Sequence, residues 1–433
     1  MLLNVLYRSQ PIVDACMRDM NGMRASLRIN GNMPFDPRYL FAAIVSLQMR
    51  GIGVFDTLSV NDDHGPGYDS RRRRWRHLDT CQYKTILVAE VPRVKCPEHG
   101  VVTTAVPWAE PGSGFTALFE ALVIDWLKEA STAAVARLMG LSWNAIDGIM
   151  QRAVERGLAR RQTHCAHHLG VDETAFKKRH DYVSIVSDQD ADTVLHVGEG
   201  RSKADLKAWY ASLSQGQRTA IESVSMDMWP AFINATVESV PDAEHKIAFD
   251  KFHVAKYLGD AVDQVRRQEH KALMAEGNNK LKGTKYDWLY NPRNMTSKQQ
   301  RRFKALRDAT LKTARAWAIK QLAMSLWHYV SRTWAYKGWQ RWLAWASRCR
   351  LEPVNKVAKT IKNHLWGILN AIVLKVSNGP AEGINSRIKA IKVRSRGFRN
   401  KRRFANAIYF HLGGLSLYPN PVTSCNYTHS FKR

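Results

Sequence analysis

Three carboxylates at the ends of predicted elements constrain the fold most, because their spacing is very unequal. Asp172 closes a short apolar run, Asp227 closes a predicted buried strand, and Glu382 falls in the first turn of a predicted helix. Gly379 is the expected N-cap of that helix and Pro380 its first residue. The first two acids are 55 residues apart and the last two are 155 apart. If all three meet in one site, an insertion must fill the second interval.

The apolar pattern predicts a sheet with flanking helices, followed by a long helical block. The expected strands cover residues 169–172, 182–187, 193–197, 220–228 and 246–249. The first three are expected to form a meander, and residues 256–372 are helical in pattern. Six tryptophans recur in that block at helical spacings and are expected to pack in its core, namely Trp317, Trp327, Trp334, Trp339, Trp342 and Trp345.

Acidic residues in this arrangement suit metal-dependent phosphoryl transfer. Two hard cations about 3.5–4 Å apart can activate the attacking oxygen and stabilise the leaving one. Mg²⁺ and Mn²⁺ prefer carboxylate oxygens, so Asp172, Asp227 and Glu382 are the candidate catalytic and metal-binding residues. Each acid alone is weak support for a metal site, because an acidic residue at the end of a strand is common and usually solvated.

The charge balance favours a nucleic-acid partner. The chain has 65 Lys and Arg against 38 Asp and Glu, a net charge of +27 over 433 residues. Cations placed beside phosphates release condensed counterions, which gives sequence-independent affinity for DNA or RNA. A basic protein whose charges are merely solvated is the alternative. No secretory signal or membrane span is expected, and the six cysteines are expected to be thiols of a cytoplasmic protein.

Two helices around Met139-Gly140-Leu141 are typical of a helix-turn-helix. Ser142 is the expected N-cap of the second helix, which would present Asn144 and Gln151 to a DNA groove. An ordinary helical hairpin is the alternative. The preceding segment, from the arginine run at 71–76 onward, suggests a small β module.

Four short segments around the acids carry a family resemblance. They are Gly170-Val171-Asp172-Glu173-Thr174, Ser225-Met226-Asp227-Met228-Trp229, Phe249-Asp250-Lys251-Phe252-His253-Val254 and Asn378-Gly379-Pro380-Ala381-Glu382-Gly383-Ile384-Asn385. Together they resemble the DDE transposases of the insertion-sequence group called ISL-three. The basic stretches Lys282 to Tyr286 and Arg394 to Phe404 are similar too, so the likeness runs from about Arg74 to Phe410.

The resemblance implies an α/β fold in which an RNase H-like mixed-sheet catalytic core is interrupted by an all-helical insertion. A helix-turn-helix and a small zinc-ribbon-like β module are expected to precede this core. The first aspartate should end the first strand and the second should end the fourth. Relatives often carry two Cys-x-x-Cys-like knuckles, but a structural Zn²⁺ needs four ligands. Only Cys96 and His99 form a clear knuckle here, and Cys81 with His77 or His64 could supply the remaining ligands, so the zinc module is expected to be degenerate.

The expected divisions of the chain follow from these elements. Residues 1–65 stay unassigned. The remaining segments are a β module over 66–112, a helix-turn-helix over 113–163, the first part of the core over 164–254, the helical insertion over 255–372, the last core helix with the third acid over 373–412, and a tail over 413–433.

Further residues near the acids are candidates for supporting roles. Asp250 and His253 match the Asp-x-Phe-His segment of the family; Asp250 is either a further acid near the metals or a structural partner of a cation such as Arg266. A basic helix is expected after Glu382, with a solvated charged face as the alternative. The candidate DNA contacts are Lys282, Lys285, Arg387, Lys389, Lys392, Arg394, Arg396 and Arg399.

The leading hypothesis is a transposase that binds terminal inverted repeats and hydrolyses a phosphodiester at the element end with Mg²⁺ or Mn²⁺. It would then direct the freed 3′-hydroxyl into target DNA. By analogy with other transposases, a homodimer on paired ends near the bacterial nucleoid is expected. Two alternatives are a non-catalytic DNA-binding protein or repressor derived from such an enzyme, and an RNase H-like nuclease without strand transfer. The intact acids argue against the first, whereas side chains alone do not separate the second.

Overall fold

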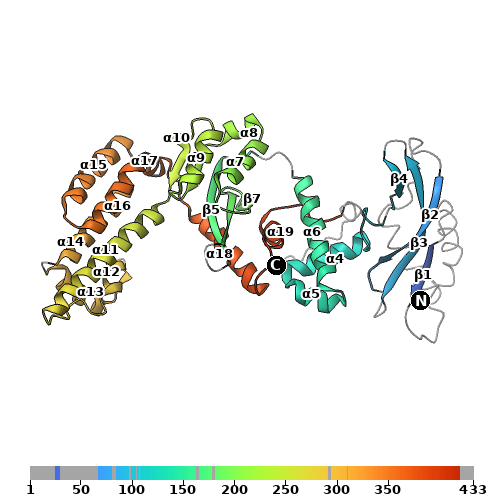
Figure 1. Cartoon of the computed structure of the whole chain (residues 1–433), viewed down its shortest axis with the longest axis horizontal. Helices are drawn as coiled ribbons and strands as arrows, with labels where there is room; N and C mark the ends of the chain where they lie inside the picture. Colours follow the sequence, from blue (N-terminus) through green and yellow to red (C-terminus); the bar gives the residue numbers. More distant parts are fainter. Residues whose placement is uncertain are drawn as a thin grey trace, which may run out of the picture. The chain divides into compact units, whose positions relative to one another are not determined.

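The structure is a computed structural model of the chain, and the part that it describes forms two compact units. One unit is drawn from Met1–Arg161 and Leu415–Arg433, the other from Gln162–Gly414 (Figure 1). None of the described helices is long and apolar enough to cross a membrane. The described residues are 25–29, 67–79, 84–96, 99–103, 105–106, 108–161, 165–177, 181–290, 294–309 and 311–419.

A small antiparallel sheet opens the first unit. Its strands are β1 (Ala25–Ile29), β2 (Gly67–Arg76), β3 (Thr85–Cys96) and β4 (Gly100–Thr103). They follow the order β1-β3-β2, and β4 pairs with β3. The predicted β module is therefore present, and Trp75 and Trp108 form its core with an edge-to-face contact at 5.5 Å between ring centroids. Most of the unassigned segment 1–65 lies outside the described residues.

Three helices follow, and the last two meet at Gly140 as the sequence predicts. They are α4 (Ala117–Glu129), α5 (Thr132–Met139) and α6 (Trp143–Ala159). Ser142 caps α6 by accepting the Ala145 N–H, and Gly140 turns the chain between α5 and α6 with φ of 60°.

A buried carboxylate holds the first and third of these helices together. Glu120 of α4 is 1% exposed and accepts hydrogen bonds from Arg152 and Arg156 of α6 and from Ser113. The carboxylate is thereby fully paired, which a buried charge requires. This ion cluster ties α6 to α4.

A five-stranded mixed sheet forms the centre of the second unit. Its strands are β5 (His168–Lys177), β6 (Asp181–Asp188), β7 (Thr193–Gly198), β8 (Ser223–Met226) and β9 (Ile247–Phe249). Their order is β7-β6-β5-β8-β9, with an antiparallel meander over the first three strands and parallel pairs β5–β8 and β8–β9. This topology confirms the predicted RNase H-like core.

Several helices surround this sheet. They are α7 (Lys203–Ser212), α8 (Gln215–Ala220), α9 (Pro230–Ser239), α10 (Ala243–Lys246), α18 (Gly379–Arg394) and α19 (Lys401–Leu412). Helix α18 contacts β5, and α19 contacts β7. The predicted basic helix after Glu382 is thus two helices, because Arg396 and Gly397 take positive φ values of 55° and 90° and break the helix.

An all-helical block fills the long interval between β9 and α18. Its elements are α11 (Lys251–Ala275), α12 (Lys285–Leu289), α13 (Ser297–Arg307), α14 (Lys312–Ser325), the 3₁₀ turn η2 (Leu326–His328), α15 (Arg332–Arg348), α16 (Glu352–Asn363) and α17 (Leu365–Leu374). Helix α11 runs without a break through the expected boundary at 254, and α17 runs through that at 372. One continuous apolar core joins the block to the sheet.

The tryptophan stripe is only partly core. Trp339 and Trp342 of α15 are fully buried, whereas Trp334 and Trp345 are exposed. Buried positions on α15 recur every three to four residues, and Trp334 and Trp345 fall on the opposite side of the helix. The prediction of core packing is therefore confirmed for Trp339 and Trp342 and wrong for Trp334 and Trp345.

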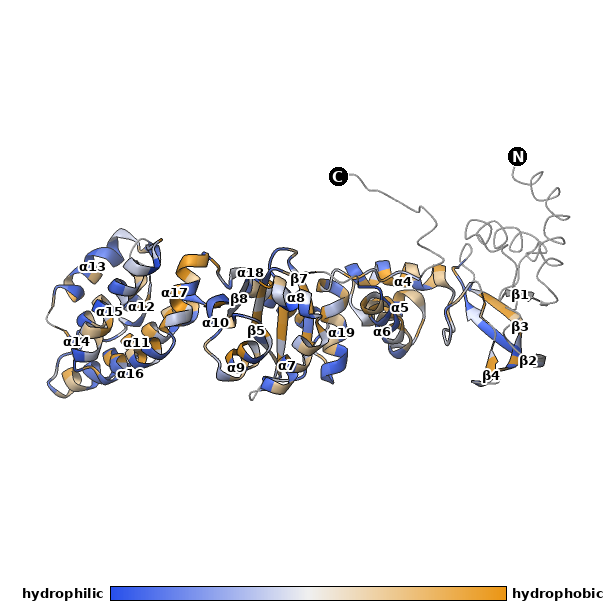
Figure 2. Ribbon diagram, turned by 90° about the horizontal axis from the view of Figure 1, so that it is seen from above, coloured by the Kyte–Doolittle hydropathy of each residue, from blue (hydrophilic) through white to orange (hydrophobic). Residues whose placement is uncertain are grey.

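Helix α17 brings the chain back to the edge of the sheet. It is strongly hydrophobic in Figure 2, and it packs on β9 so closely that a Cβ on Gly367 would stand 2.5 Å from the Phe249 ring. The buried Asn370 amide donates to the carbonyls of Glu244 and Ile247 at 2.7 and 2.8 Å. The insertion thus ends on the strand beside which it begins.

Gly367→Ala is expected to destabilise the second unit, because the new methyl group would overlap Phe249. Overpacking costs about 1–3 kcal/mol, whereas alanine at an open helix position gains up to about 1 kcal/mol over glycine. Gly383→Ala in α18 is the matched control, since nothing lies within 4 Å of its new atom. Urea unfolding followed by tryptophan fluorescence should place the Gly367→Ala midpoint below wild type and the control at or above it. Equal midpoints for the two variants would contradict this packing.

Candidate active site

Three aspartates stand in one row across the parallel strands. Val171 of β5 pairs with Met226 of β8, and Met226 pairs with Phe249 of β9. The next residue on each strand is an aspartate, namely Asp172, Asp227 and Asp250. Neighbouring residues in register point to the same face of a sheet, so the three carboxylates are neighbours.

Asp172 does not end its strand, contrary to the expectation. Its parallel partner β8 stops at Met226, but the antiparallel partner β6 continues to pair with β5 as far as Lys177. Asp172 therefore sits in the middle of β5, at the point where one of its two neighbouring strands ends. Asp227 and Asp250 directly follow β8 and β9, as predicted.

Burial raises the pKa of both outer carboxyls in the row. The pKa of Asp172 is raised by desolvation, and the charges of Asp227 and Asp250 add to the rise, while the Glu173 N–H and His253 oppose it. Burial likewise raises the pKa of Asp250, against the backbone amides of Phe252 and Asn378. Clustered, partly buried carboxylates with raised pKa values are typical of active sites.

His253 lies beside the middle aspartate. Its Nδ1 is 3.4 Å from Asp227 Oδ1, and the same oxygen accepts the Met228 N–H at 2.6 Å. The proposed alternative for Asp250, a structural pair with Arg266, is wrong. Arg266 instead donates to Asp263 at 2.7 and 2.9 Å on the same helix.

A polar network attaches the start of α18 to the sheet. Ser225 of β8 donates to the Asn378 side chain at 2.8 Å, and Gln189 donates to Ser225 at 2.6 Å and to the Ser377 carbonyl at 3.3 Å. Asn378, not Gly379, is the N-cap of α18, because its carbonyl accepts the Glu382 N–H at 2.9 Å. The network places the first turn of α18 beside the aspartate row.

Glu382 lies in that first turn, and its side chain is exposed. One turn later, Asn385 Nδ2 donates to Asp172 Oδ2 at 2.7 Å. The structure therefore brings the predicted third acid to the same region as the first two. Within the described ranges, no three His, Cys, Asp or Glu side chains are already arranged to hold a metal ion.

The cations after Glu382 divide into two groups. Three contact the protein itself: Arg387 pairs with Asp192, Lys392 donates to the Ala175 carbonyl at 2.9 Å, and Arg394 lies 2.8 Å from His411. Burial and the Arg394 charge lower the pKa of His411 to about 4, so this histidine is neutral at pH 7. The other candidate DNA contacts in this region are exposed, namely Lys389, Arg396 and Arg399.

The candidate DNA contacts elsewhere are mostly at the surface. Lys282 and Lys285 are exposed at the start of α12. Asn144 is exposed near the start of α6, and Gln151 lies two turns later on the same side. The Gln151 amide donates to Glu155 at 2.7 Å, a bond that a base contact would have to replace.

The zinc candidates are only partly within the described residues. Cys96 Sγ lies 3.4 Å from His99 Nδ1, as two ligands of one ion would require. Cys81 lies outside the described residues. His77 is buried and hydrogen-bonded to Thr116 at 2.9 Å, so it is committed to the junction with α4.

Sequence reasoning gave no role to several residues of this site. Asn385, Gln189 and Ser225 each bond an acid-bearing strand or the start of α18. Asn385 and Ser225 fall inside the segments that carry the family resemblance, which was the available signal. Gln189 carried none, because its partners are far along the chain.

Three family comparisons agree with these elements. Residues 169–408, more than half of the chain, match the family described as "Transposase". Residues 104–154 match the "Helix-turn-helix domain of transposase family ISL3". Residues 66–99 match the "zinc-finger of transposase IS204/IS1001/IS1096/IS1165".

Curated relatives are similar over most of their length. The transposase for insertion sequence element IS1557 of Mycobacterium tuberculosis is 29% identical over 382 residues, 81% of this chain and 83% of the relative. The transposase for insertion sequence element IS1001 of Bordetella parapertussis is 27% identical over 341 residues, 78% of this chain and 84% of the relative. The chain therefore belongs to the ISL3 family of transposases and is a DNA-binding, DNA-cutting enzyme.

Proposed function

We propose that Asp172, Asp227 and Glu382 form the catalytic centre of this transposase, with Asp250 and His253 as accessory residues. The observation that carries the proposal is the single register of β5, β8 and β9, which aligns the aspartates. The docking of α18 supports it, because Asn378 and Asn385 attach this helix to the strands on either side of Glu382.

The side chains of this region fit a divalent cation. In the described part of the chain, the buried Asp250 Oδ2 has no hydrogen-bond partner, which is costly for a carboxylate without a nearby cation. Carboxylate oxygens are the ligands that Mg²⁺ and Mn²⁺ prefer. Asp172, Asp227 and Glu382 would hold the ions. When bound, the ions place positive charge beside the attacking and leaving oxygens.

The reaction is phosphoryl transfer in two steps. Water attacks a phosphorus at the element end, and the P–O3′ bond breaks, which leaves a 3′-hydroxyl and a 5′-phosphate. That hydroxyl then attacks a phosphodiester of target DNA and displaces its 3′-oxygen. The aspartate row fixes where the scissile phosphate lies, His253 orients the Asp227 carboxylate, and Asn385 orients that of Asp172.

DNA recognition is divided between two surfaces. Asn144 and Gln151 of α6 read the terminal inverted repeats, because side chains near the start of a recognition helix reach base edges. Lys389, Arg396 and Arg399 contact the backbone near the scissile phosphate, together with Lys282 and Lys285 of the insertion.

Three further features complete the proposal. Cys96 and His99 supply two ligands of a structural Zn²⁺, and Cys81 is the candidate for a third.

A homodimer acts on paired element ends, because two ends must be joined to one target. The enzyme works on the DNA of the bacterial nucleoid in the cytoplasm.

Asp172→Asn, Asp227→Asn and Glu382→Gln are each expected to lower DNA cleavage by about 10²–10⁴-fold, since each removes a metal-ligand charge worth several kcal/mol. Affinity for end DNA should change little. Glu352→Gln is the matched control for Glu382→Gln, because Glu352 is also an exposed acid in the first turn of a helix. Cleavage of a labelled element end in Mg²⁺ measures the effect. Near-native cutting by any one variant would remove that residue from the centre.

Asp250→Asn is expected to raise the melting temperature in EDTA at pH 8 and to reduce the stabilisation by Mn²⁺. Burial raises the Asp250 pKa, so the folded state favours the protonated form, and stability is lost as the pH rises through the folded-state pKa. The difference between variant and wild type should disappear below the ordinary value of 3.8. Differential scanning fluorimetry with and without Mn²⁺ measures both effects, at about 2–4 °C per kcal/mol. Asp242→Asn, at an exposed turn, is the control. An unchanged response to Mn²⁺ would exclude Asp250 from the metal site.

The double variant Asn144→Ala/Gln151→Ala is expected to reduce discrimination between element-end and random duplex DNA, at about 1–3 kcal/mol per lost base contact. Lys389→Gln should instead weaken both duplexes equally and lower the salt dependence. Competition binding at two salt concentrations separates the two results. If the double variant binds both duplexes more weakly but discriminates between them like wild type, α6 contacts only the DNA phosphates and not the base edges.

A further inference from the structure

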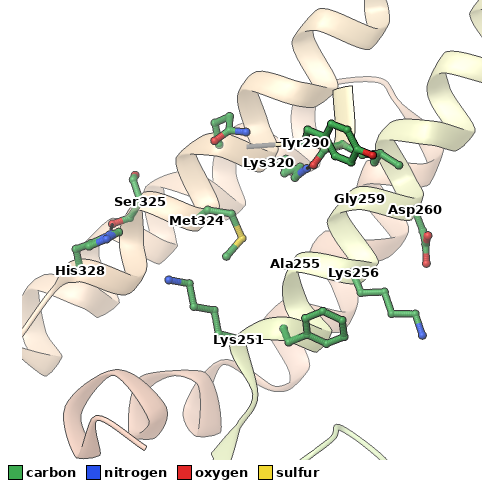
Figure 3. Close-up of a pocket in the computed structure, with 13 residues that line it drawn as sticks. Lys251, Ala255, Lys256, Gly259, Asp260, Tyr290, Lys320, Met324, Ser325 and His328 are labelled. Atoms are coloured by element: carbon green, nitrogen blue, oxygen red, sulfur yellow. Dashed lines mark hydrogen bonds between the residues drawn. The ribbon is translucent and has the colours of Figure 1, made fainter. Parts of the chain in front are cut away.

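A pocket of about 720 Å³ opens between α11, α12 and α14 (Figure 3). It begins at Lys251, the residue after Asp250, and follows α11 as far as Asp260. Its far wall comes from α14 and η2, with Met324, Ser325 and His328. Nothing in the active-centre proposal uses this pocket.

The lining of the pocket is cationic. Three lysines and one acid line it, namely Lys251, Lys256, Lys320 and Asp260. Lys251 reaches across from α11 toward Met324 and His328 in Figure 3, and its Nζ lies 6.0 Å from the Trp327 ring centroid. Lys320 is buried, and the Leu289 carbonyl accepts its Nζ–H at 3.2 Å. A surplus of cations in a concave site attracts an anionic ligand.

Exposed aromatic rings border the same pocket. Phe252 and Tyr290 line it although 57% and 50% of their surfaces are exposed. From Tyr290 the aromatic surface continues along α12, because the Tyr286 ring lies 5.5 Å from it and Lys285 Nζ lies 5.7 Å from the Tyr286 ring. Rings that alternate with cations are typical of surfaces on which unpaired bases stack while phosphates are neutralised.

We propose that this pocket binds an unpaired stretch of the DNA strand that leaves the catalytic centre. Bases stack on Tyr290 and Phe252, and the lysines neutralise the phosphates. A cavity of this volume suits one or two nucleotides, whereas a duplex is too wide for it. The inference rests on the proposed function only for the position of the scissile strand, because Asp250 and Lys251 are adjacent residues.

The test measures binding in EDTA, so that it does not depend on cleavage. Full-length protein is titrated into a fluorescein-labelled thymidine oligomer of about 20 nucleotides and, separately, into a random duplex, and anisotropy is followed. Tyr290→Ala is expected to weaken single-strand binding by about tenfold, the loss of stacking on one base. Duplex affinity should stay within about twofold, since the pocket does not admit a duplex.

Two variants control for general damage. Tyr290→Phe keeps the ring and should bind the oligomer like wild type. Tyr336→Ala removes a ring that is 48% exposed on α15, outside the pocket, and should also leave binding unchanged. A 5-iodouracil oligomer should form its photochemical crosslink at Tyr290 or Phe252.

Three results would overturn the inference, and a fourth would separate it from the proposed function. A loss with Tyr290→Phe as large as with Tyr290→Ala would mean that the hydroxyl or the fold matters, not stacking. If Tyr290→Ala loses the same affinity for the oligomer and for the duplex, Tyr290 contributes to non-specific DNA binding rather than to single-strand binding. Displacement of the oligomer by polyglutamate as effectively as by unlabelled oligomer would make the pocket a site for acidic protein segments. A wild-type-like cleavage rate for Asp172→Asn would overturn the catalytic centre alone and leave these binding results standing.

Discussion

The common register of β5, β8 and β9 is the constraint on which the rest of the second unit depends. Its last paired residues, Val171, Met226 and Phe249, are fully buried, and an aspartate follows each of them. A slip of one residue on any strand would turn its aspartate to the other face and expose the apolar residue before it. Burial of the sheet therefore specifies the position of the acids, although the acids themselves destabilise it, as the raised pKa values of Asp172 and Asp250 indicate.

The long insertion is compatible with one acidic centre because it leaves and returns at the same strand. Helix α11 begins one residue after β9, and α17 packs on β9 through Gly367 and Asn370. The insertion thus begins directly after Asp250 and ends a few residues before Asn378. Because the apolar core continues from the sheet into the helices, the insertion is anchored to the centre rather than attached by a linker. A pocket in the insertion can therefore keep a constant position relative to the acids.

The sequence predicted the parts of this arrangement that depend on local patterns. Apolar runs that end in Asp227 and Asp250 placed both acids, and Ser142 and Gly140 marked the turn before α6. The extent of β5 was missed, because Asp172-Glu173-Thr174 is polar and only pairing with β6 extends the strand to Lys177. The break at Arg396 was missed because arginine rarely takes a positive φ. Asn385 was missed as a partner of Asp172 because the two are 213 residues apart, beyond any local pattern.

The position of Glu382 follows from the two asparagines that flank it on α18. Asn378, Glu382 and Asn385 are spaced four and three residues apart, so they share one side of the helix. Asn378 bonds Ser225 on β8 and Asn385 bonds Asp172 on β5, so this side faces the strands that bear the acids. The residues that pack α18 onto the sheet lie on the adjacent side, at Ala381, Ile384 and Ile388. Glu382 is exposed, in contrast to these packing residues. The catalytic centre proposed above therefore requires the exposed Glu382 side chain to turn toward the aspartate row while Asn378 and Asn385 keep α18 docked.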